Sequence, residues 1–569
     1  MTSLEDGHVT LGGAAHEAAV AEASWSRLDR RRTILVLISI MVAMLLSALD
    51  QTVVGTAMPR VIAELNGMQH YAWVATAYLL ASTASMPIWG KLSDAYGRKL
   101  FYLVGISLFL LGSVLCGQAH SMTELIAFRG LQGLGAGAMM PIGQAVIGDL
   151  FPPKERGKWI GLLMSVFGLA TIIGPTLGGW ITDNWGWRWT FYVNVPVGII
   201  ALGLIAYALP GHVQTHKHRI DYWGAAYLIL ATVPLLLGFS WAGTTYAWGS
   251  PQIIGCFVGS VVFWIVFVLH ENRAAEPILS PSLFKNSIFS VSAVAGFIAM
   301  AGMFGAIMFL PLFVQGVQGN SATDSGMVLT PMMLGFIASS IIGGQILSRT
   351  GKYKIMLLTS FAVTILGLYL LSRMDVGTSN STLVVNMLVA GFGMGVGMSV
   401  FTIIVQNAFP LSRLGEVTAG LQFFRSIGGT IGMAIFGAVL NNRFSAAMGD
   451  RLPAQLKAVA ASKPDAFNNP QVLVSPEARG QLEKAFAKFG DQGMNLFHQL
   501  MDAVRHSLAI SISDLFTVSA VVTAVGLLVL IWLKEIPLRD TQEMPDLAEA
   551  PAEEPRVLEP SASPAKGGR

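Results

Sequence analysis

Long apolar runs, separated by short polar connections, fill most of the sequence between residues 33 and 534. A helix needs about 20 mostly apolar residues to cross the hydrocarbon core of a bilayer, because it rises about 1.5 Å per residue. The pattern therefore predicts an all-α membrane protein with fourteen transmembrane helices. The predicted spans are 33–58, 71–89, 100–118, 122–149, 157–182, 190–209, 221–239, 253–270, 288–313, 325–348, 354–372, 382–408, 417–440 and 511–534.

The positive charges support an even number of spans. Alternate connections hold basic clusters, such as those at 30–32 and 349–354, whereas the short connections between them hold only Arg60, Arg188 and Arg373. Cytoplasmic loops of membrane proteins are enriched in lysine and arginine. We therefore expect both termini in the cytoplasm and the chain in the inner or plasma membrane.

Composition agrees with a chain surrounded by lipid. Charged residues make up 12% of the sequence, hydrophobic residues 53%, and the mean hydropathy is +0.59. Soluble globular proteins carry about 25% charged residues. The two cysteines, Cys116 and Cys256, lie in apolar runs, which argues against a zinc site or a disulfide framework. No G-x-x-x-x-G-K-[ST] stretch that would bind ATP occurs either.

Three sequence matches indicate an internal duplication. The stretch at 90–99 recurs 254 residues later, and Phe151-Pro152 recurs 258 residues later as Phe409-Pro410. The third match is the pattern Gly133-x-Gly135-x-Gly137, which recurs as Gly393-x-Gly395-x-Gly397 at an offset of 260. Repeated halves are typical of secondary transporters, whose binding site lies between them.

The duplication divides the chain into segments. It pairs the first six spans with the last six and leaves the seventh and eighth as an inserted hairpin. The predicted segments are a polar cytoplasmic N-terminal segment (1–32), an N-terminal six-helix bundle (33–209), the inserted hairpin with its flanking loops (210–287), a C-terminal six-helix bundle (288–534) that includes an external loop with helical spacing (441–510), and a disordered cytoplasmic tail (535–569).

Five stretches resemble a known family. They are Leu49–Pro59, Gly90–Lys99, Arg129–Gly137, Gly174–Gly179 and Trp187–Gly198. Together they resemble the major facilitator superfamily, and within it the fourteen-span drug:proton antiporters, over about residues 33–534. Three positions depart from the family pattern: Ala95 replaces an arginine of the loop motif, Ala170 replaces the first glycine of the antiporter motif, and Gly55 stands where many relatives carry asparagine.

The resemblance implies the major facilitator fold, with two six-helix bundles and two inserted helices. It also implies a multidrug-type antiporter that exports amphipathic or cationic small molecules by alternating access. The expected partners are the substrate, protons and the lipid bilayer, and the expected energy source is the proton gradient. We expect a monomer that uses no cofactor, metal or ATP and binds no nucleic acid. We also expect that the protein is not an enzyme.

Other readings stay open from the residues. The same fold serves exporters dedicated to one lipid, siderophore or metabolite, and proton-coupled uptake symporters. A membrane enzyme would need a convergent catalytic set, and none is visible; a sensor without transport would lack proton-dependent flux.

Asp50 is the acidic residue placed deepest within a predicted span. It lies nine residues before Pro59, about 13 Å from the outer end of its helix, and Arg129 lies eight residues after Ser121, at about 12 Å. A charge at such depth is costly and is a functional candidate. We expect both residues to border a central cavity and to control proton loading of Asp50, through a water-mediated or conformation-dependent contact. The alternative is a permanent structural ion pair.

The family resemblance implies roles for two further motifs, the loop motif and the antiporter motif. In the loop motif, Gly90 and Gly97 permit a tight turn; the resemblance implies that Asp94 latches the two halves in one access state. The alternative is an ordinary solvated loop. The remaining charged members of this gate are Arg98 and Lys99.

The antiporter motif combines small residues with a helix-bending proline. Gly174, Gly178 and Gly179 offer a face for close helix packing, and Pro175 removes a backbone donor. We expect a pliable interface between the two halves here, with ordinary packing as the alternative.

Polar residues within the spans are candidates for the substrate cavity or for interhelical hydrogen bonds. Arg425 is the most notable, because its repeat equivalent is Phe167 and the fold therefore does not require a charge there. It would contact an anionic part of the substrate or pair with Glu416. The other candidates are Gln51, Tyr78, Gln132, Gln144, Gln315, Gln406, Asn407 and Gln422.

Overall fold

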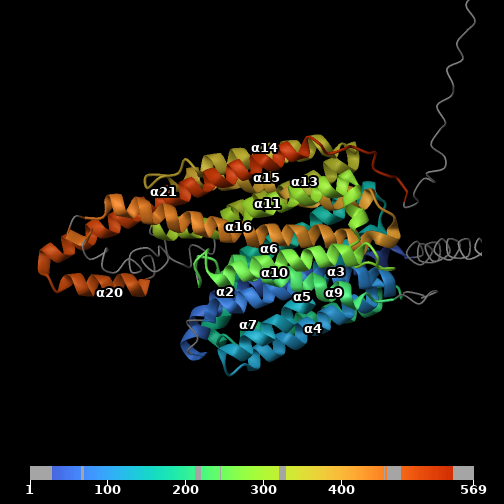
Figure 1. Cartoon of the computed structure of the whole chain (residues 1–569), viewed down its shortest axis with the longest axis horizontal. Helices are drawn as coiled ribbons and strands as arrows, with labels where there is room; N and C mark the ends of the chain where they lie inside the picture. Colours follow the sequence, from blue (N-terminus) through green and yellow to red (C-terminus); the bar gives the residue numbers. More distant parts are fainter. Residues whose placement is uncertain are drawn as a thin grey trace, which may run out of the picture.

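The computed structural model describes residues 28–65, 70–211, 219–243, 245–318, 329–453, 455–457 and 476–541. Residues 1–27 of the predicted N-terminal segment, residues 542–569 of the predicted tail and part of the external loop lie outside the described residues. The described residues form an all-helical bundle whose long helices run roughly side by side (Figure 1).

The first half of the chain contains α2 (Arg30–Leu65), α3 (Tyr71–Tyr96), α4 (Arg98–Gln118), α5 (Met122–Leu150), α6 (Pro153–Trp185), α7 (Trp189–Tyr192) and α8 (Asn194–Ala208). The hairpin contains α9 (Tyr222–Trp241) and α10 (Pro251–Glu271). The second half contains α11 (Ser287–Gly316), α13 (Thr330–Thr350), α14 (Tyr353–Leu371), α15 (Asn380–Asn407), α16 (Leu414–Arg451), α20 (Pro476–Ala487) and α21 (Gly490–Leu530), with short 3₁₀ turns at Pro281–Lys285 and Leu411–Arg413.

Twelve of the described helices are long and apolar enough to cross a membrane. The two other predicted spans, α3 and α5, are helices of 26 and 29 residues but fall outside this set. The polar side chains of Arg129, Gln132 and Gln144 lower the hydropathy of α5. Most of α5 is buried by other helices, where such side chains can find partners. The count of fourteen spans therefore stays a prediction.

The glycine contacts give the register of the internal repeat. A side chain at Gly133 would meet the backbone of Tyr78 in α3, and one at Gly391 would meet the backbone of Met332 in α13. These contacts relate α5 to α15 by 258 residues and α3 to α13 by 254. The predicted equivalence of Gly133 with Gly393 is therefore wrong by two residues; a glycine at nearly every second position let the motif match out of register.

The two halves touch through two equivalent helix crossings. Where α6 crosses α13, a Cβ at Gly157 would lie 2.5 Å from the carbonyl oxygen of Gly344; where α3 crosses α16, a Cβ at Gly90 would lie 2.5 Å from that of Gly415. Glycine permits this close approach of backbones. Both crossings lie at the end of the bundle where α6 and α16 begin, which we call the closed end (right in Figure 1).

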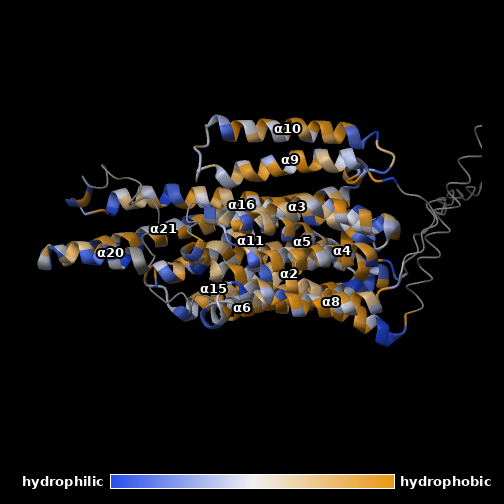
Figure 2. Ribbon diagram, turned by 90° about the horizontal axis from the view of Figure 1, so that it is seen from below, coloured by the Kyte–Doolittle hydropathy of each residue, from blue (hydrophilic) through white to orange (hydrophobic). Residues whose placement is uncertain are grey.

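The inserted hairpin lies at the periphery, beside α3 and α16 (Figure 2). The Ser260 hydroxyl of α10 donates to the Ala231 carbonyl of α9 at 2.6 Å, which joins the two helices. Trp73 of α3 packs edge-on against Trp241 of α9, with ring centroids 5.4 Å apart. Much of α10 is exposed and apolar, as expected for a helix that faces lipid.

Two helices of the second half are much longer than a bilayer requires. With 38 and 41 residues, α16 and α21 span about 57 and 62 Å, against about 30 Å of hydrocarbon. Their ends opposite the closed end project from the bundle and carry α20 (Figure 1). The helical spacing predicted for the external loop is thus confirmed within its described residues.

Close packing inside the second half is testable at Gly391. A valine side chain introduced at this position would overlap the α13 backbone, and we expect Gly391→Val to lower the melting temperature in detergent by several degrees, since overpacking costs about 1–3 kcal/mol. Gly437→Val in α16 is the matched control, because no atom lies within 4 Å of the Cβ position there. Equal melting temperatures for the two variants would contradict this packing.

Candidate functional site

Asp50 is completely buried in α2 and is held by side chains from two other helices, α5 and α8. The Arg129 Nη1 donates to Asp50 Oδ2 at 2.6 Å, while the Gln132 and Asn194 amides donate to Oδ1 at 2.8 and 2.9 Å. Asp50 and Arg129, which were predicted to lie at similar depths in the membrane, are therefore in direct contact. In this conformation the contact is a direct ion pair between buried residues, not a water-mediated one at a cavity; a conformation-dependent contact and a permanent structural pair both stay predictions.

The Arg129 guanidinium has several further partners. It donates to Gln132 Oε1 at 2.8 Å and to the Val74 carbonyl at 3.3 Å, and it lies 4.2 Å from the centre of the Tyr78 ring. Burying two charges costs several kcal/mol per ion unless their hydrogen-bonding capacity is satisfied. The network supplies this satisfaction, since the two oxygens of the Asp50 carboxyl group accept three hydrogen bonds.

The sequence analysis missed Asn194 as a member of this network. Besides Asp50, its amide donates to the Ser113 Oγ at 3.0 Å, and the Ser113 hydroxyl donates to the Phe191 carbonyl at 2.9 Å. Asn194 begins α8 within a stretch that was noted only for its family resemblance. Its signal was an amide at the start of an otherwise apolar helix, the same kind of signal that made Gln132 and Asn407 candidates.

The antiporter motif packs within the first half, next to Asp50. A side chain at Gly174 would overlap the Thr52 side chain, and one at Gly178 would lie 2.8 Å from the Val53 carbonyl oxygen. Gly179 has no neighbour within 4 Å of its Cβ position. Gly174 and Gly178 therefore do not form the expected interface between the halves; they instead let α6, with Pro175 in its interior, lie close against α2.

Asp94 joins the two halves at the closed end. Its Oδ1 accepts from the Gly415 backbone N–H at 2.8 Å and its Oδ2 from the Glu416 N–H at 2.7 Å. These are free donors of the first turn of α16, where the helix dipole favours an anion. Arg98 forms ion pairs with both Asp94 and Asp149, the latter at 2.8 Å.

One residue connects the helices that carry this gate. Gly97 alone separates α3 from α4 and has φ of +99°, a conformation that favours glycine. The turn places Arg98 at the start of α4, facing Asp94 from the preceding helix. Lys99 is half-buried and follows Arg98.

The remaining polar candidates divide between several places. The Gln406 amide donates to the Gln144 carbonyl at 3.0 Å, and Asn407 bonds to Pro537 and Arg539, so these residues belong to the closed end rather than to a substrate cavity. Gln422 contacts the Met140 sulfur across the two halves at 2.8 Å. Gln51 is exposed next to the buried Asp50, and Gln315 is half-buried near the end of α11.

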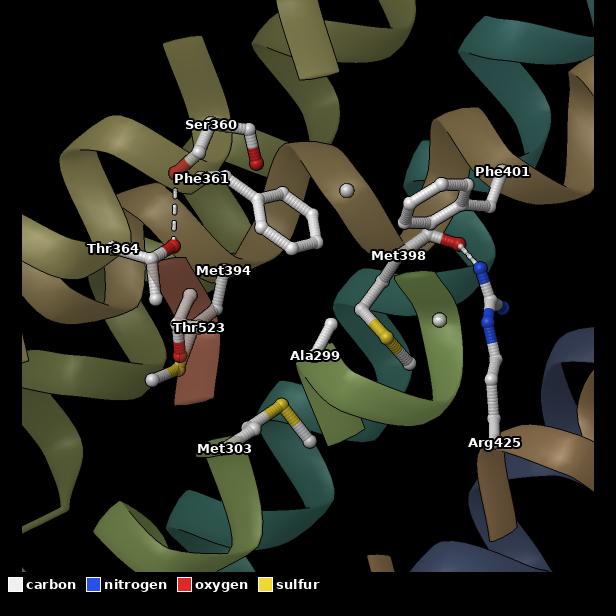
Figure 3. A pocket seen from close by; sticks show the side chains of 12 residues that line it. Ala299, Met303, Ser360, Phe361, Thr364, Met394, Met398, Phe401, Arg425 and Thr523 are labelled. Atoms are coloured by element: carbon white, nitrogen blue, oxygen red, sulfur yellow. Dashed lines mark hydrogen bonds between the residues drawn. The ribbon is translucent and has the colours of Figure 1, made fainter. Parts of the chain in front are cut away.

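Arg425 is fully buried and lines a cavity inside the second half (Figure 3). Its predicted pairing with Glu416 is wrong: Glu416 accepts instead from Arg413, at 3.0 and 3.1 Å, and from the Ser280 backbone at 2.9 Å. Among the described residues Arg425 forms no ion pair, and its hydrogen bonds go to neutral acceptors.

Comparison with known proteins gives consistent results. The sequence model described as Major Facilitator Superfamily matches residues 40–433. The chain is 42% identical over 537 residues to the Multidrug transporter protein MdtP of Bacillus subtilis (strain 168), covering 91% of this chain and 97% of the relative. It is 36% identical over 509 residues to Multidrug resistance protein 3 of the same organism, covering 90% and 96%. Efflux pump dotC of Dothistroma septosporum is 33% identical over 414 residues, covering 71% of each chain.

Two solved structures share the fold at low identity. The human organic anion transporter MFSD10 (TETRAN) has a TM-score of 0.56 at 14% identity, and the match covers 87% of this chain and 100% of that chain. A bacterial homolog of the human lysosomal transporter Spinster, in an inward-facing and unoccupied conformation, has a TM-score of 0.52 at 16% identity and is covered completely by 90% of this chain.

The gate at Asp94 generates a labelling prediction. We replace Cys116 and Cys256 with serine and introduce Ser348→Cys, which is half-buried close to the α6–α13 crossing. Asp94→Asn keeps the shape but loses one acceptor and the charge, so the closed end should open more often. We expect a maleimide to modify the cysteine at least about threefold faster, a change of about 0.7 kcal/mol in the opening equilibrium.

The control is Asp183→Asn, which removes an exposed acid paired with Arg60 away from the gate. It should leave the modification rate unchanged. Equal rates for the Asp94 and Asp183 variants would remove the latch role.

Proposed function

Because the chain belongs to the Major Facilitator Superfamily and is a multi-pass transporter of the cell membrane, we propose that it is a proton-coupled antiporter that exports amphipathic small molecules by alternating access. The names of its relatives, which include a multidrug transporter, a multidrug resistance protein and an efflux pump, support export. The proton gradient is the proposed energy source, without ATP or a cofactor, and the monomer is the proposed unit.

The observation that carries the proton coupling is the buried Asp50. It is the one acid among the described residues that lies in mid-helix, completely buried, and bonded to an arginine from another helix. Protonation would remove its charge and weaken its bonds to Arg129, Gln132 and Asn194 together. Because these partners come from α5 and α8, a single proton changes how α2 is held against two neighbours.

Transport follows from coupling this change to the closed end. We propose fourteen spans with both termini in the cytoplasm, so the closed end is the cytoplasmic one and the described conformation is closed toward the cytoplasm. Its basic residues, which include Lys91, Lys154, Lys158 and Lys352, agree with this orientation. The small-residue packing of Gly174 and Gly178 against α2 offers a direct mechanical route from Asp50 to α6, which also forms one crossing between the halves.

The test uses purified protein in sealed vesicles with an imposed pH gradient and a set of lipophilic cations, neutral compounds and amphipathic anions. We expect the wild type to accumulate at least one of them against its gradient and a protonophore to abolish this. Asp50→Asn should lower gradient-driven flux at least about tenfold, since about 1.4 kcal/mol of lost coupling corresponds to that factor. Downhill exchange of the same compound should persist.

Asp183→Asn serves as control, because it neutralises an acid on the exposed surface and should transport like the wild type. Undiminished gradient-driven export by Asp50→Asn would reject the coupling role. Uptake driven in the direction of proton flow would instead identify a symporter, and flux of one compound alone would identify a dedicated exporter.

A further inference from the structure

Arg425 carries a buried positive charge that no acid in the described residues compensates. Its Nη1 donates to Thr402 Oγ1 at 3.4 Å and to Gln422 Oε1 at 3.3 Å, its Nη2 donates to the Met398 carbonyl at 3.3 Å, and its Nε has no partner within the described part of the chain. These bonds are long for a charged donor, whose bonds to carboxylates measure about 2.7–2.9 Å. A buried cation with weak neutral partners has unused capacity to bind an anion.

The space in front of this guanidinium is apolar and flexible. In the described conformation the cavity between α11, α14, α15, α16 and α21 has a free volume of about 20 Å³, room for one water-sized group, so the apolar body of a ligand enters only when the lining side chains move apart. Figure 3 shows Arg425 extending beside Phe401 toward the Met398 carbonyl, with other methionine side chains around the space. Its lining side chains are Ala299, Met303, Ser360, Phe361, Thr364, Met394, Met398, Phe401 and Thr523, with Gly296 and Gly397.

Two neighbours connect the site to the rest of the transporter. Gln422, which accepts from Arg425, also contacts the Met140 sulfur of the first half, so Arg425 lies one side chain behind the surface between the halves. Gly296 leaves room for the arginine, since a Cβ there would lie 3.2 Å from both its Cγ and its Nε.

We propose that this cavity binds amphipathic anions, with the carboxylate, sulfonate or phosphate group on Arg425 and the apolar body among the methionine and phenylalanine side chains. Thioethers and aromatic rings accommodate varied apolar shapes. The inference rests on the proposed export function and adds a substrate class to it. In the first half the equivalent inference fails, because Arg129 is already neutralised by Asp50.

The test measures binding separately from transport. The protein is placed in nanodiscs of neutral phosphatidylcholine and titrated with 11-(dansylamino)undecanoate and, in parallel, with its methyl ester. The wild type should bind the acid at least about tenfold more tightly than the ester, Arg425→Lys should retain most of this preference, and Arg425→Met should abolish it. Gly296→Ala, which crowds the guanidinium while keeping its charge, should weaken the acid more than the ester and provides a second readout if Arg425→Met does not fold.

Asp50→Asn distinguishes the two proposals. It should keep the wild-type preference for the acid even though gradient-driven export is lost. Equal affinity of the wild type for acid and ester, or an unchanged preference in Arg425→Met, would overturn the anion site while leaving the antiport proposal intact.

A second inference comes from the segment that follows α21, residues 533–540, which we call the strap. Its residues 535–540 belong to the tail predicted as disordered (535–569), whereas the structure packs them along the closed end. The Tyr353 hydroxyl donates to the Lys534 carbonyl at 2.8 Å and accepts from the Ile536 N–H at 2.6 Å, and Leu538 is buried.

The strap supplies a cation that the repeat lacks. In the first half, Arg156 donates to the carbonyls of Gly148 and Phe151, at 2.8 and 2.7 Å, and so caps the end of α5. The residue 258 positions later is Leu414, which cannot do this. Arg539 donates to the carbonyls of Gln406 and Phe409, at 3.4 and 3.1 Å, which are the same two positions of the repeat at the end of α15.

The strap also reaches the other half. The Lys154 backbone N–H donates to the Arg539 carbonyl at 3.3 Å, and the Lys154 ammonium pairs with Asp540 at 2.8 Å. Asn407 binds the strap from the second half, accepting from the Arg539 N–H at 3.2 Å. One short segment thus holds the start of α6 and the end of α15 at once.

We infer that the strap clamps the closed end and must leave α6 before that end can open. In a background without Cys116 and Cys256, we join Lys154→Cys to Asp540→Cys by oxidation. Transport should fall at least about tenfold on oxidation and return with a reductant, while Lys154→Cys alone should be insensitive.

Arg539→Gln should speed maleimide labelling of Ser348→Cys severalfold. Full transport by the cross-linked protein would overturn the inference, and an unchanged labelling rate would exclude a clamping role for Arg539.

Discussion

The ion pair between Asp50 and Arg129 is the interaction on which the first half depends. A carboxylate that is fully removed from water must be paired or neutral, because an isolated charge in so apolar a setting costs several kcal/mol. Its satisfaction requires α5 and α8 to present Arg129, Gln132 and Asn194 at the same depth. The glycines of α6 then allow that helix to lie against α2 beside the acid.

The two halves share a backbone plan but not a chemistry. Their helix crossings follow the same offsets, so that Gly157 with Gly344 mirrors Gly415 with Gly90. Yet the second half has Met387 where the first has Arg129. It has Arg425 where the first has Phe167. The duplicated scaffold therefore separates the proposed proton site from the proposed anion site, one in each bundle.

Much of the helical architecture could be predicted from apolar runs and from the repeat, because both follow from the length of a helix in a bilayer. Asp50 and Arg129 could be paired by depth alone. The helix against which a small-residue face packs could not be predicted. Gly174 and Gly178 of α6 pack against α2, whereas Gly157 of the same helix packs against the other half, and no local feature distinguishes them. The contacts of Asn407 and Arg539 join residues more than 130 positions apart, which only the tertiary structure reveals.

The unbroken length of α16 has a geometric consequence. Its first turn bonds to Asp94, Arg425 lies about three turns further along, and its last turns project from the opposite end of the bundle. A stiff rod of about 57 Å that pivots near its Gly415 crossing by about 10° sweeps its far tip through about 10 Å. The helix is thus a lever, and a sub-ångström loosening at the closed end becomes a displacement at the opposite end of the bundle large enough for a molecule bound there to sense or resist.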